Sequence, residues 1–286
     1  MEEAEQRWIV ITGSTGGIGT EITKILAARG KSLILLNRST TKAETQRGQL
    51  LSEFPDLKVE LIQADLMDAE QISLAVAKMT ALPGRIDALY NNSGILTADK
   101  VLSPQGVESH FAVNTLAPYQ LIQGLRGKMA RPASETPAVI INFSSSAVNP
   151  QKTLKLDSLV NPEKIGGLMG AYAQTKLAVT VLSAALAEDL KSQNILIRAV
   201  DPGATKTAMT KGNSAMPKPL QWLAPLLFGA PHTQAVKIVD SAEPLAFSSR
   251  TGIYVANRKE KKLPKPAVDA ATQKSLVSLL DGLLPS

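Results

Sequence analysis

The chain has 286 residues and no cysteine. This absence excludes disulfides, thiolate metal sites and a cysteine nucleophile, and it is typical of proteins of the reducing cytosol. Histidine is scarce as well: only His110 and His232 are present, too few for a metal site built by the protein. Neither is paired with a nucleophile, so we assign both a structural role. We predict a cytoplasmic protein without a metal site.

Long apolar runs are also missing. The most apolar patches, such as Trp222 to Ala230, are far shorter than the roughly 18 residues that a membrane span needs. The sequence begins without a basic region followed by an apolar run, so no secretory signal is expected. We therefore expect a soluble protein with no membrane span.

Charge is only mildly unbalanced, with 31 basic and 25 acidic residues and a net charge of +6. Part of the basic excess lies in residues 257–265, which could bind a nucleic acid or an anionic membrane. Aromatic residues are not interleaved with these charges, as they commonly are in nucleic-acid sites. The run is therefore interpreted as a solvated tail, and no nucleic-acid partner is predicted.

Short apolar runs alternate with helix-like stretches along the chain. Strands are expected at residues 8–12, 32–36, 59–64, 86–90, 138–143, 195–200 and 252–256. Helices are expected at residues 18–29, 40–53, 68–79, 104–129, 170–191 and 267–283. This alternation predicts an α/β fold with a doubly wound, seven-stranded parallel sheet and helices on both faces.

No repeat or linker interrupts the alternation, so a single domain over residues 1–286 is predicted. The exception is residues 202–231, where five prolines surround a small apolar cluster. An irregular segment of this size in a compact domain is often a lid over a ligand. Its apolar side chains could close over a hydrophobic substrate, or could pack against the domain or a second subunit. These side chains are Met209, Met216, Leu220, Trp222, Leu223, Leu226, Leu227 and Phe228.

The first expected strand runs directly into a glycine-rich turn, "TGSTGGIG", residues 12–19. Glycines there allow positive φ and close approach of a ligand, and the following helix offers free N–H groups to a pyrophosphate. Gly13 and Gly19 fit two spacings, one completed by Gly17 and the other by Gly16. The turn predicts a dinucleotide-binding core over residues 7–200, with tight packing alone as the alternative.

The end of the second expected strand, "LLNRS", indicates which dinucleotide is bound. An acidic residue at this place accepts the ribose 2′-hydroxyl of NAD(H), whereas an arginine accommodates the 2′-phosphate of NADP(H). Here Asn37 and Arg38 occupy it. Because guanidinium matches phosphate geometry, NADP(H) is favoured over NAD(H). The alternative is an exposed arginine that merely begins a helix.

A tyrosine and a lysine stand four residues apart in "YAQTK", at positions 172 and 176. This spacing places both side chains on one helical face. A tyrosine has a pKa of about 10, and a nearby ammonium favours its phenolate, which would make Tyr172 a general acid or base. The alternative is an accidental pair on a surface helix.

Other polar segments follow the remaining strands. "NNSG" follows the fourth strand, three serines follow the fifth, and "DPGATKT" follows the sixth, while Asn114 lies in the long helix between the fourth and fifth. Hydroxyls at the carboxyl end of a strand can hydrogen-bond a substrate oxygen.

These motifs, in this order and over nearly the whole chain, resemble the short-chain dehydrogenase/reductase family in its ordinary, non-extended form. The resemblance implies a Rossmann fold in which Tyr172 is the general acid. It also implies that Lys176 lowers the pKa of Tyr172, Ser145 polarises a carbonyl, and Asn114 binds a water linking Lys176 to solvent. Ser144 and Ser146 remain alternatives to Ser145. The implied cofactor contacts are Gly13, Ser14, Thr15, Gly17, Ile18, Gly19, Asn37, Arg38, Asp65, Leu66, Asn92, Ser93, Gly94, Tyr172, Lys176, Pro202, Gly203, Thr205 and Thr207.

Three departures accompany the resemblance. Ser93 stands where the family commonly has alanine, and three serines compete for one position. Tyr172 lies 27 positions after Ser145, a longer separation than in the compact members of the family. The extra segment, residues 147–170, is similar to an insertion in the retinol dehydrogenase-like and protochlorophyllide reductase-like branch, as are "GVESHFAVN" and "TGIYVANRK". That branch favours NADP(H) and apolar carbonyl compounds. Family members commonly pair through their long helices, which implies a homo-oligomer, a dimer or a tetramer.

The sequence therefore predicts an NADP(H)-dependent oxidoreductase that acts on a small carbonyl or alcohol substrate. The main alternative is a catalytically silent NADP(H)-binding regulator that senses redox state. The presence of Tyr172 and Ser145 argues against this alternative, because a protein that only binds the cofactor needs neither side chain.

Overall fold

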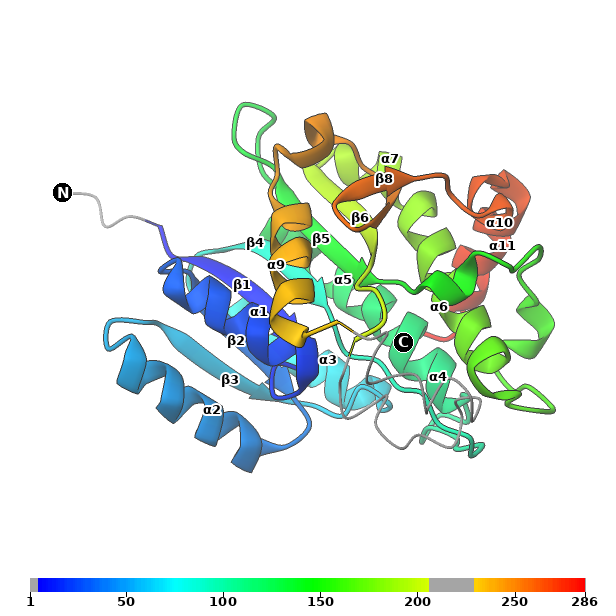
Figure 1. The fold of residues 1–286 in the computed structure, drawn as a ribbon, viewed down its shortest axis with the longest axis horizontal. Helices are drawn as coiled ribbons and strands as arrows, with labels where there is room; N and C mark the ends of the chain where they lie inside the picture. The colour runs from blue at the N-terminus through cyan, green and yellow to red at the C-terminus, as the bar shows by residue number, and fades with distance from the viewer. Residues whose placement is uncertain (1–4, 206–228, 286) are drawn as a thin grey trace.

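The computed structural model describes residues 5–205 and 229–285. Its centre is one sheet with the strand order β3-β2-β1-β4-β5-β6-β7-β8 (Figure 1). The strands are β1 (Arg7–Thr12), β2 (Ser32–Asn37), β3 (Val59–Gln63), β4 (Arg85–Asn91), β5 (Ala138–Phe143), β6 (Ile195–Asp201), β7 (Ile253–Ala256) and β8 (Lys259–Lys261). Strands β1 to β7 pair in parallel, which confirms the predicted α/β class. The order reverses between β1 and β4, the place where such sheets bind ligands.

The sheet has an eighth strand, so the prediction of seven strands was wrong by one. β8 pairs antiparallel with β7 through a two-residue turn, Asn257–Arg258, in which both residues have positive φ. This backbone suits a tight hairpin. The residues of β8 are all exposed, and two of the three are lysines. Their pairing rests on backbone hydrogen bonds at a sheet edge, which leaves no apolar pattern in the sequence.

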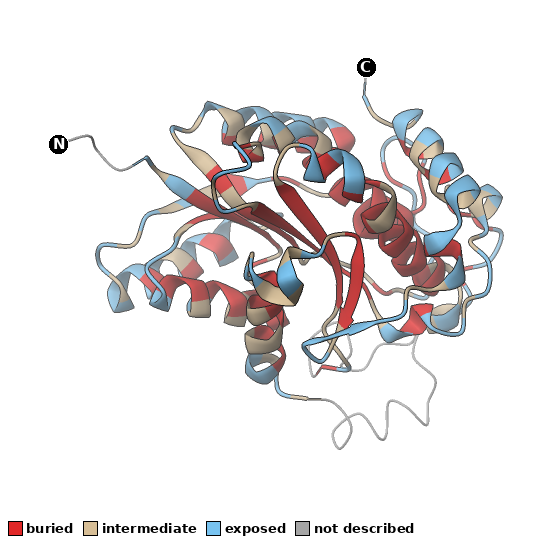
Figure 2. Cartoon of the chain, turned by 90° about the horizontal axis from the view of Figure 1, so that it is seen from above, coloured by how far each residue is buried: buried red, intermediate tan, exposed pale blue. Residues whose placement is uncertain are grey.

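Helices cover both faces of the sheet, and the strands lie buried between them (Figure 2). α1 (Gly17–Ala28), α2 (Thr40–Glu53) and α9 (Pro231–Ala242) contribute to the core that includes Ile9 and Ile11. α3 (Ala69–Ala81), α5 (Ala117–Met129) and α6 (Ala171–Ala185) contribute to the core that includes Trp8 and Val10. Alternate residues of β1 thus face opposite layers. α9 was not predicted from the sequence, although Ile238 and Val239 are buried against the sheet.

Two long helices expected from the sequence are interrupted. The stretch predicted from residue 104 begins at residue 109 and comprises α4 (Ser109–Phe111), a π-helix (Ala112–Leu116) and α5. The stretch from residue 170 divides into α6 and α7 (Ala187–Lys191). The C-terminal stretch is also divided, into α10 (Lys265–Val268) and α11 (Ala270–Asp281), and both pack against α6.

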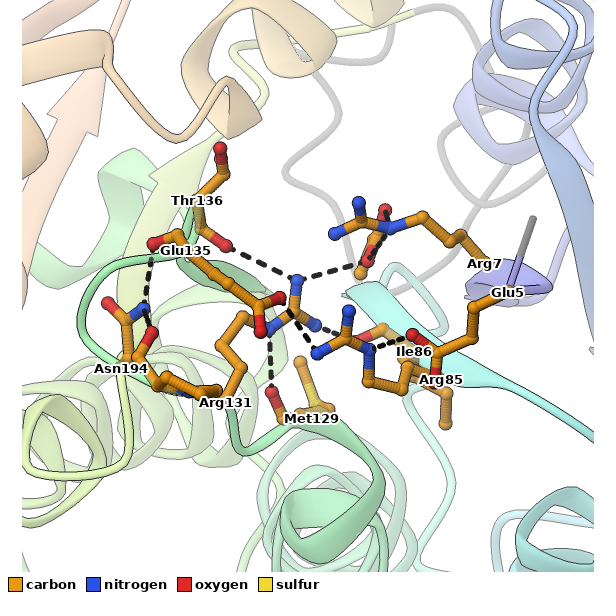
Figure 3. Close-up of polar contacts among 11 residues, drawn as sticks. Glu5, Arg7, Arg85, Ile86, Met129, Arg131, Glu135, Thr136 and Asn194 are labelled. Atoms are coloured by element: carbon orange, nitrogen blue, oxygen red, sulfur yellow. Dashed lines mark hydrogen bonds and ion pairs between the residues drawn. The ribbon is translucent and has the colours of Figure 1, made fainter. Parts of the chain in front are cut away.

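Charged side chains bind the amino end of β4 to its surroundings (Figure 3). The Arg131 side chain is 1% exposed, lies 3.0 Å from Asp87 and donates a 2.6 Å hydrogen bond to the Ile86 carbonyl. Arg85 pairs with Glu5 at 2.7 Å and with Glu135 at 2.8 Å. This network lies at the amino ends of the strands, away from the end of the sheet where their carboxyl ends lie.

Candidate active site

The predicted site segments meet at the end of the sheet where the carboxyl ends of the parallel strands lie. The glycine turn follows β1, Asn92 follows β4, Ser145 follows β5, and Pro202 follows β6. Since these strands run parallel in the order β1-β4-β5-β6, their carboxyl ends lie side by side. Strand order, rather than closeness in sequence, therefore assembles the site.

The backbone of the glycine turn selects one of the two possible spacings. Gly13 has φ +65° and Gly17 has φ +50°. A Cβ on Gly19 would lie 2.3 Å from the Gly13 carbonyl oxygen, whereas a Cβ on Gly16 would meet nothing within 4 Å. Gly13, Gly17 and Gly19 are thus the glycines that the fold requires.

The amino end of α1 suits an anionic ligand. Gly16 precedes α1 without forming a side-chain cap, and the first turn carries no acidic residue. The N–H groups of this turn therefore face no competing side-chain cap and no repelling carboxylate. The chemistry of the turn therefore suits the pyrophosphate of a dinucleotide, and the contacts predicted there stay a prediction.

Asn37 is buried at the end of β2, and its expected contact with the cofactor stays a prediction. Its side chain is 5% exposed and donates a 2.8 Å hydrogen bond to Ser14 Oγ. Ser14 Oγ donates in turn to Gln46 Oε1 at 2.7 Å, and the Gln46 amide donates to the Ser14 carbonyl. Asn37 and Gln46 thus support the glycine turn from beneath.

Arg38 points outward from the end of β2. Its side chain is 77% exposed, and its guanidinium lies 3.8 Å from Asp65. Asp65 also accepts a 3.0 Å hydrogen bond from the Met67 N–H, and the neighbouring Leu66 packs against the core. An exposed guanidinium at this place can accommodate a 2′-phosphate.

The segment after β4 supports the turn from the other side. The Asn92 amide donates to the carbonyl oxygens of Thr12 and Gly13 at 2.8 and 3.0 Å. The Ser93 N–H donates to Thr12 Oγ1 at 2.9 Å. A Cβ on Gly13 would lie 2.6 Å from Ser93 Oγ, so the serine side chain occupies the space that the glycine leaves.

Tyr172 and Lys176 share the inner face of α6, as predicted. They are 9% and 4% exposed, and Lys176 Nζ lies 6.0 Å from the centre of the tyrosine ring. Ser145 hydrogen-bonds the Tyr172 side chain, while Ser144 bonds Thr180 at 2.7 Å and Ser146 is exposed. Of the three serines, Ser145 is thus the one that the fold brings to the tyrosine.

The expected lowering of the Tyr172 pKa by Lys176 is not found. Burial raises the pKa of Tyr172, the hydrogen bond with Ser145 opposes that rise, and the Asp201 carboxylate adds to it. Burial also lowers the pKa of Lys176 to about 8. Both shifts have the same cause, because removal from water disfavours the charged form of each group.

Asn114 lies in the π-helix, a feature that often marks functional sites. Its amide accepts from the Ile95 N–H at 2.9 Å, and donates to the Ile95 carbonyl and to Thr175 Oγ1, each at 3.1 Å. Asn114 thus joins the segment after β4 to α6. The water relay expected of it stays a prediction.

Asp201 is a polar group near the site whose role the sequence analysis missed. Its carboxylate accepts a 2.8 Å hydrogen bond from the Gly203 N–H, and the Tyr254 hydroxyl lies 3.5 Å from it. Burial raises the pKa of Asp201, and the carboxylate in turn raises the pKa of Lys176 against the effect of burial. In the sequence, the signal that could have identified Asp201 is its position directly before Pro202 and Gly203.

His110 is the second such residue. It was assigned a structural role with no partner named, yet its ring lies 2.8 Å from Glu108 and meets the Tyr172 ring edge to face. The signal was its spacing, since His110 stands one helical turn before Asn114.

Most of the predicted lid, together with Thr207, lies outside the described residues. Its described ends meet: Thr205 and Gly229 form a parallel bridge, and the Gly229 N–H donates to the Ala204 carbonyl at 2.9 Å. Pro202 and Gly203 lead into this bridge from the end of β6. The described residues on either side of this segment therefore lie together beyond the carboxyl end of β6.

Comparison with known proteins places this geometry in context. The chain is 31% identical over 211 residues to the short-chain dehydrogenase TIC 32 A, chloroplastic, of Brassica napus, covering 72% of this chain and 66% of that protein. It is 29% identical over 203 residues to retinol dehydrogenase 12 of Bos taurus, covering 71% and 63%. The match thus spans slightly less than two thirds of either relative.

The fold also matches solved structures. The Pseudomonas aeruginosa RhlG/NADP active-site complex has a TM-score of 0.70 and 22% identity, with 95% of this chain and 98% of that chain covered. Within residues 5–205 and 229–285, no helix is both long and apolar enough to cross a membrane. The family model for short chain dehydrogenases matches residues 7–218, and the chain belongs to that family of oxidoreductases.

Proposed function

We propose that this protein is an NADP(H)-dependent oxidoreductase that interconverts a carbonyl compound and its alcohol. The observation that carries the proposal is the meeting of Tyr172, Ser145 and Lys176 beside a dinucleotide-binding turn, at one edge of one sheet. A bound nicotinamide would supply or accept the hydride. The Tyr172 hydroxyl would supply or accept the proton at the substrate oxygen.

The pKa directions fit Tyr172 as an acid. Because burial raises its pKa, Tyr172 keeps its proton at neutral pH and can donate it to a carbonyl oxygen that gains negative charge. Ser145, which hydrogen-bonds Tyr172, would donate to the same oxygen. Lys176, held at the end of β5, would add positive charge beneath the site.

NADP(H) is the proposed cofactor because Arg38 is exposed at the end of β2, where a 2′-phosphate is accommodated. The RhlG complex, which contains NADP, has the same fold. Asn37 supports the glycine turn through Ser14, and we keep its contact with the cofactor as part of the proposal.

An apolar substrate is proposed from two sources. The candidate lid carries several large apolar side chains, and relatives include a retinol dehydrogenase. We propose the cytoplasm as the location of this protein. In this it would differ from the Brassica relative, which is named as chloroplastic.

The homo-oligomer, expected to form through the long helices, stays a prediction. α10 and α11 of this chain pack against α6, and Tyr119 of α5 donates a hydrogen bond to Asp281 of α11. α6 is therefore covered by the chain itself, whereas α5 keeps Gly124 and Gly127 exposed. We propose that any dimer or tetramer forms through a face other than that of α6.

The test is oxidation of NADPH and NADH, in parallel, against aliphatic, aromatic and polycyclic aldehydes and ketones. We expect turnover with NADPH in wild type. Tyr172→Phe should lose this turnover and still bind NADPH, because phenylalanine keeps the ring and lacks the hydroxyl that carries the proton. Turnover retained by Tyr172→Phe would refute its role as acid. Tight NADPH binding without turnover on any carbonyl compound would favour the silent regulator.

A further inference from the structure

A buried carboxylate and imidazole lie directly behind Tyr172. The side chains of Glu108 and His110 are both 0% exposed, and Glu108 Oε1 lies 2.8 Å from His110 Nδ1. The imidazole and phenol rings meet edge to face, with ring centres 6.5 Å apart and an interplanar angle of 79°. The imidazole, held by the carboxylate, thus meets the candidate acid from a side that solvent does not reach.

The hydrogen bonds define the protonation of His110. Its Nε2 lies 3.1 Å from the Thr97 N–H and accepts from it, so the ring proton is on Nδ1 and is donated to Glu108. Glu108 also accepts from the His110 N–H and from Ser109 Oγ. These bonds hold the pKa of Glu108 below its ordinary value despite burial. Both ring nitrogens are engaged, so His110 has no proton to offer a substrate.

His110 and Asn114 stand one helical turn apart and hold the same segment by its backbone. Asn114 binds the N–H and the carbonyl of Ile95, and His110 binds the N–H of Thr97. This segment continues from Asn92, which supports the glycine turn. One helical face therefore fixes both the segment after β4 and the ring of Tyr172.

A stabilising role alone gives a poor account of this pair. Burial of a carboxylate costs free energy, and apolar side chains of similar volume are often at least as stabilising as a buried polar pair. Directional hydrogen bonds supply what apolar packing lacks, which is a unique orientation. Here that orientation is given to the imidazole ring against which Tyr172 packs.

We propose that Glu108 and His110 are positioning residues for Tyr172. Glu108 orients the imidazole, the imidazole fixes the plane of the Tyr172 ring and the position of Thr97, and together they set where the Tyr172 hydroxyl meets the substrate oxygen. The inference rests on the proposed oxidoreductase function, because the hydroxyl it places is the proposed acid. A small displacement of a reacting group can lower a rate by about 100-fold.

Two substitutions of His110 each remove one of the two hydrogen bonds of its ring and keep the other. In His110→Gln the amide oxygen can take the place of Nε2 and accept from Thr97, whereas the bond to Glu108 is lost. In His110→Asn the amide nitrogen can take the place of Nδ1 and donate to Glu108, whereas the bond from Thr97 is lost. Both variants lose the ring against Tyr172. His232→Asn is the matched control, because the His232 side chain is 66% exposed.

We expect both His110 variants to lower kcat by about 10- to 100-fold with KM for NADPH unchanged, at a temperature where thermal unfolding shows each to be folded. Glu108→Gln has nearly the same volume and still accepts from Nδ1, so it is the milder variant and should lower kcat several-fold. The control should match wild type. Unchanged kcat in the folded His110 variants would overturn the proposal.

Hydrogen exchange at the Thr97 amide tests the geometry without turnover. Exchange should be faster in His110→Asn than in wild type, and close to wild type in His110→Gln, which keeps the acceptor. If wild type reduces no carbonyl compound, the proposed function fails. The exchange comparison still tests whether His110 holds the backbone of Thr97. Equal exchange in His110→Asn and wild type would then refute the positioning role.

Discussion

The ammonium of Lys176 donates a 2.8 Å hydrogen bond to the carbonyl oxygen of Phe143. Phe143 ends β5 two residues before Ser145, so this bond ties α6 to the strand that presents the serine. The bond holds a buried cation at the carboxyl edge of the sheet. Positive charge is thereby placed near the proposed reaction at a cost in stability.

Replacement of Lys176 by methionine is expected to abolish turnover and to raise stability at neutral pH. Burial lowers the pKa of Lys176 from 10.5 to about 8, so the charged form costs the folded state roughly 3 kcal/mol. Because the folded pKa lies below the unfolded pKa, this cost is complete below about pH 8 and disappears as the pH rises towards 10.5. At pH 7 we expect a gain of about 1 to 2 kcal/mol after loss of the hydrogen bond to Phe143.

Urea unfolding of the cofactor-free proteins at pH 7 and pH 10 measures this difference. The advantage of Lys176→Met should shrink at pH 10. The control is Lys274→Met, because Lys274 is exposed on α11 and should show no such pH dependence. A Lys176→Met protein less stable than wild type at pH 7 would contradict the expectation.

Asp201→Asn should move the alkaline limb of the reduction to lower pH. The Asp201 carboxylate raises the pKa of Tyr172, so its removal lowers that pKa. Reduction needs protonated Tyr172, and the rate therefore falls as the pH passes its pKa. The asparagine oxygen can still accept from the Gly203 N–H. We expect a displacement of roughly one pH unit in the profile of kcat.

The control for this variant is Asp56→Asn, which removes the same charge from an exposed position. It should leave the profile unchanged. An alkaline limb that stays in place, or moves to higher pH, in Asp201→Asn would show that the carboxylate does not act on Tyr172.

Gly19→Ala and Gly16→Ala test the glycine turn. A Cβ on Gly19 would collide with the Gly13 carbonyl at 2.3 Å and with the Asn92 amide at 2.6 Å, so the turn must move and NADPH affinity should fall at least 10-fold. A Cβ on Gly16 would meet no atom within 4 Å, so the free energy of unfolding should change by less than about 1 kcal/mol. Equal stability of the two variants in urea would contradict the assigned spacing.

Arg38→Asp should weaken NADPH binding by about 10- to 100-fold, the worth of a charge-assisted hydrogen bond, and should affect NADH much less. The exposed guanidinium of Arg38 faces only the Asp65 carboxylate at 3.8 Å among the ion pairs of the described residues. Arg47→Asp, on the neighbouring α2, makes the same charge change away from the end of β2. Fluorescence titration with both cofactors measures the effect. Equal losses for NADPH and NADH would remove the basis for the NADP(H) assignment.

Strongly patterned segments were predicted well from the sequence. The seven parallel strands lie within one or two residues of their predicted ends, because each is a short apolar run bounded by turn residues. α9 was missed because residues 232–251 were given no assignment, although Ala235, Ile238, Val239 and Ala242 recur at helical spacing. β8 was missed because charged residues at a sheet edge carry no apolar pattern.

The sequence by itself determined the fold class, the family and the order of the site segments. Each of these follows from local signals: apolar periodicity, glycines in a strand-to-helix turn, and a tyrosine and lysine one helical turn apart. The tertiary structure alone decided that Asn37 turns inward to Ser14, that Asp201 acts on the pKa of Tyr172, and that Glu108 and His110 pack behind the same tyrosine. These relationships depend on burial and on partners distant in sequence, which no local pattern contains.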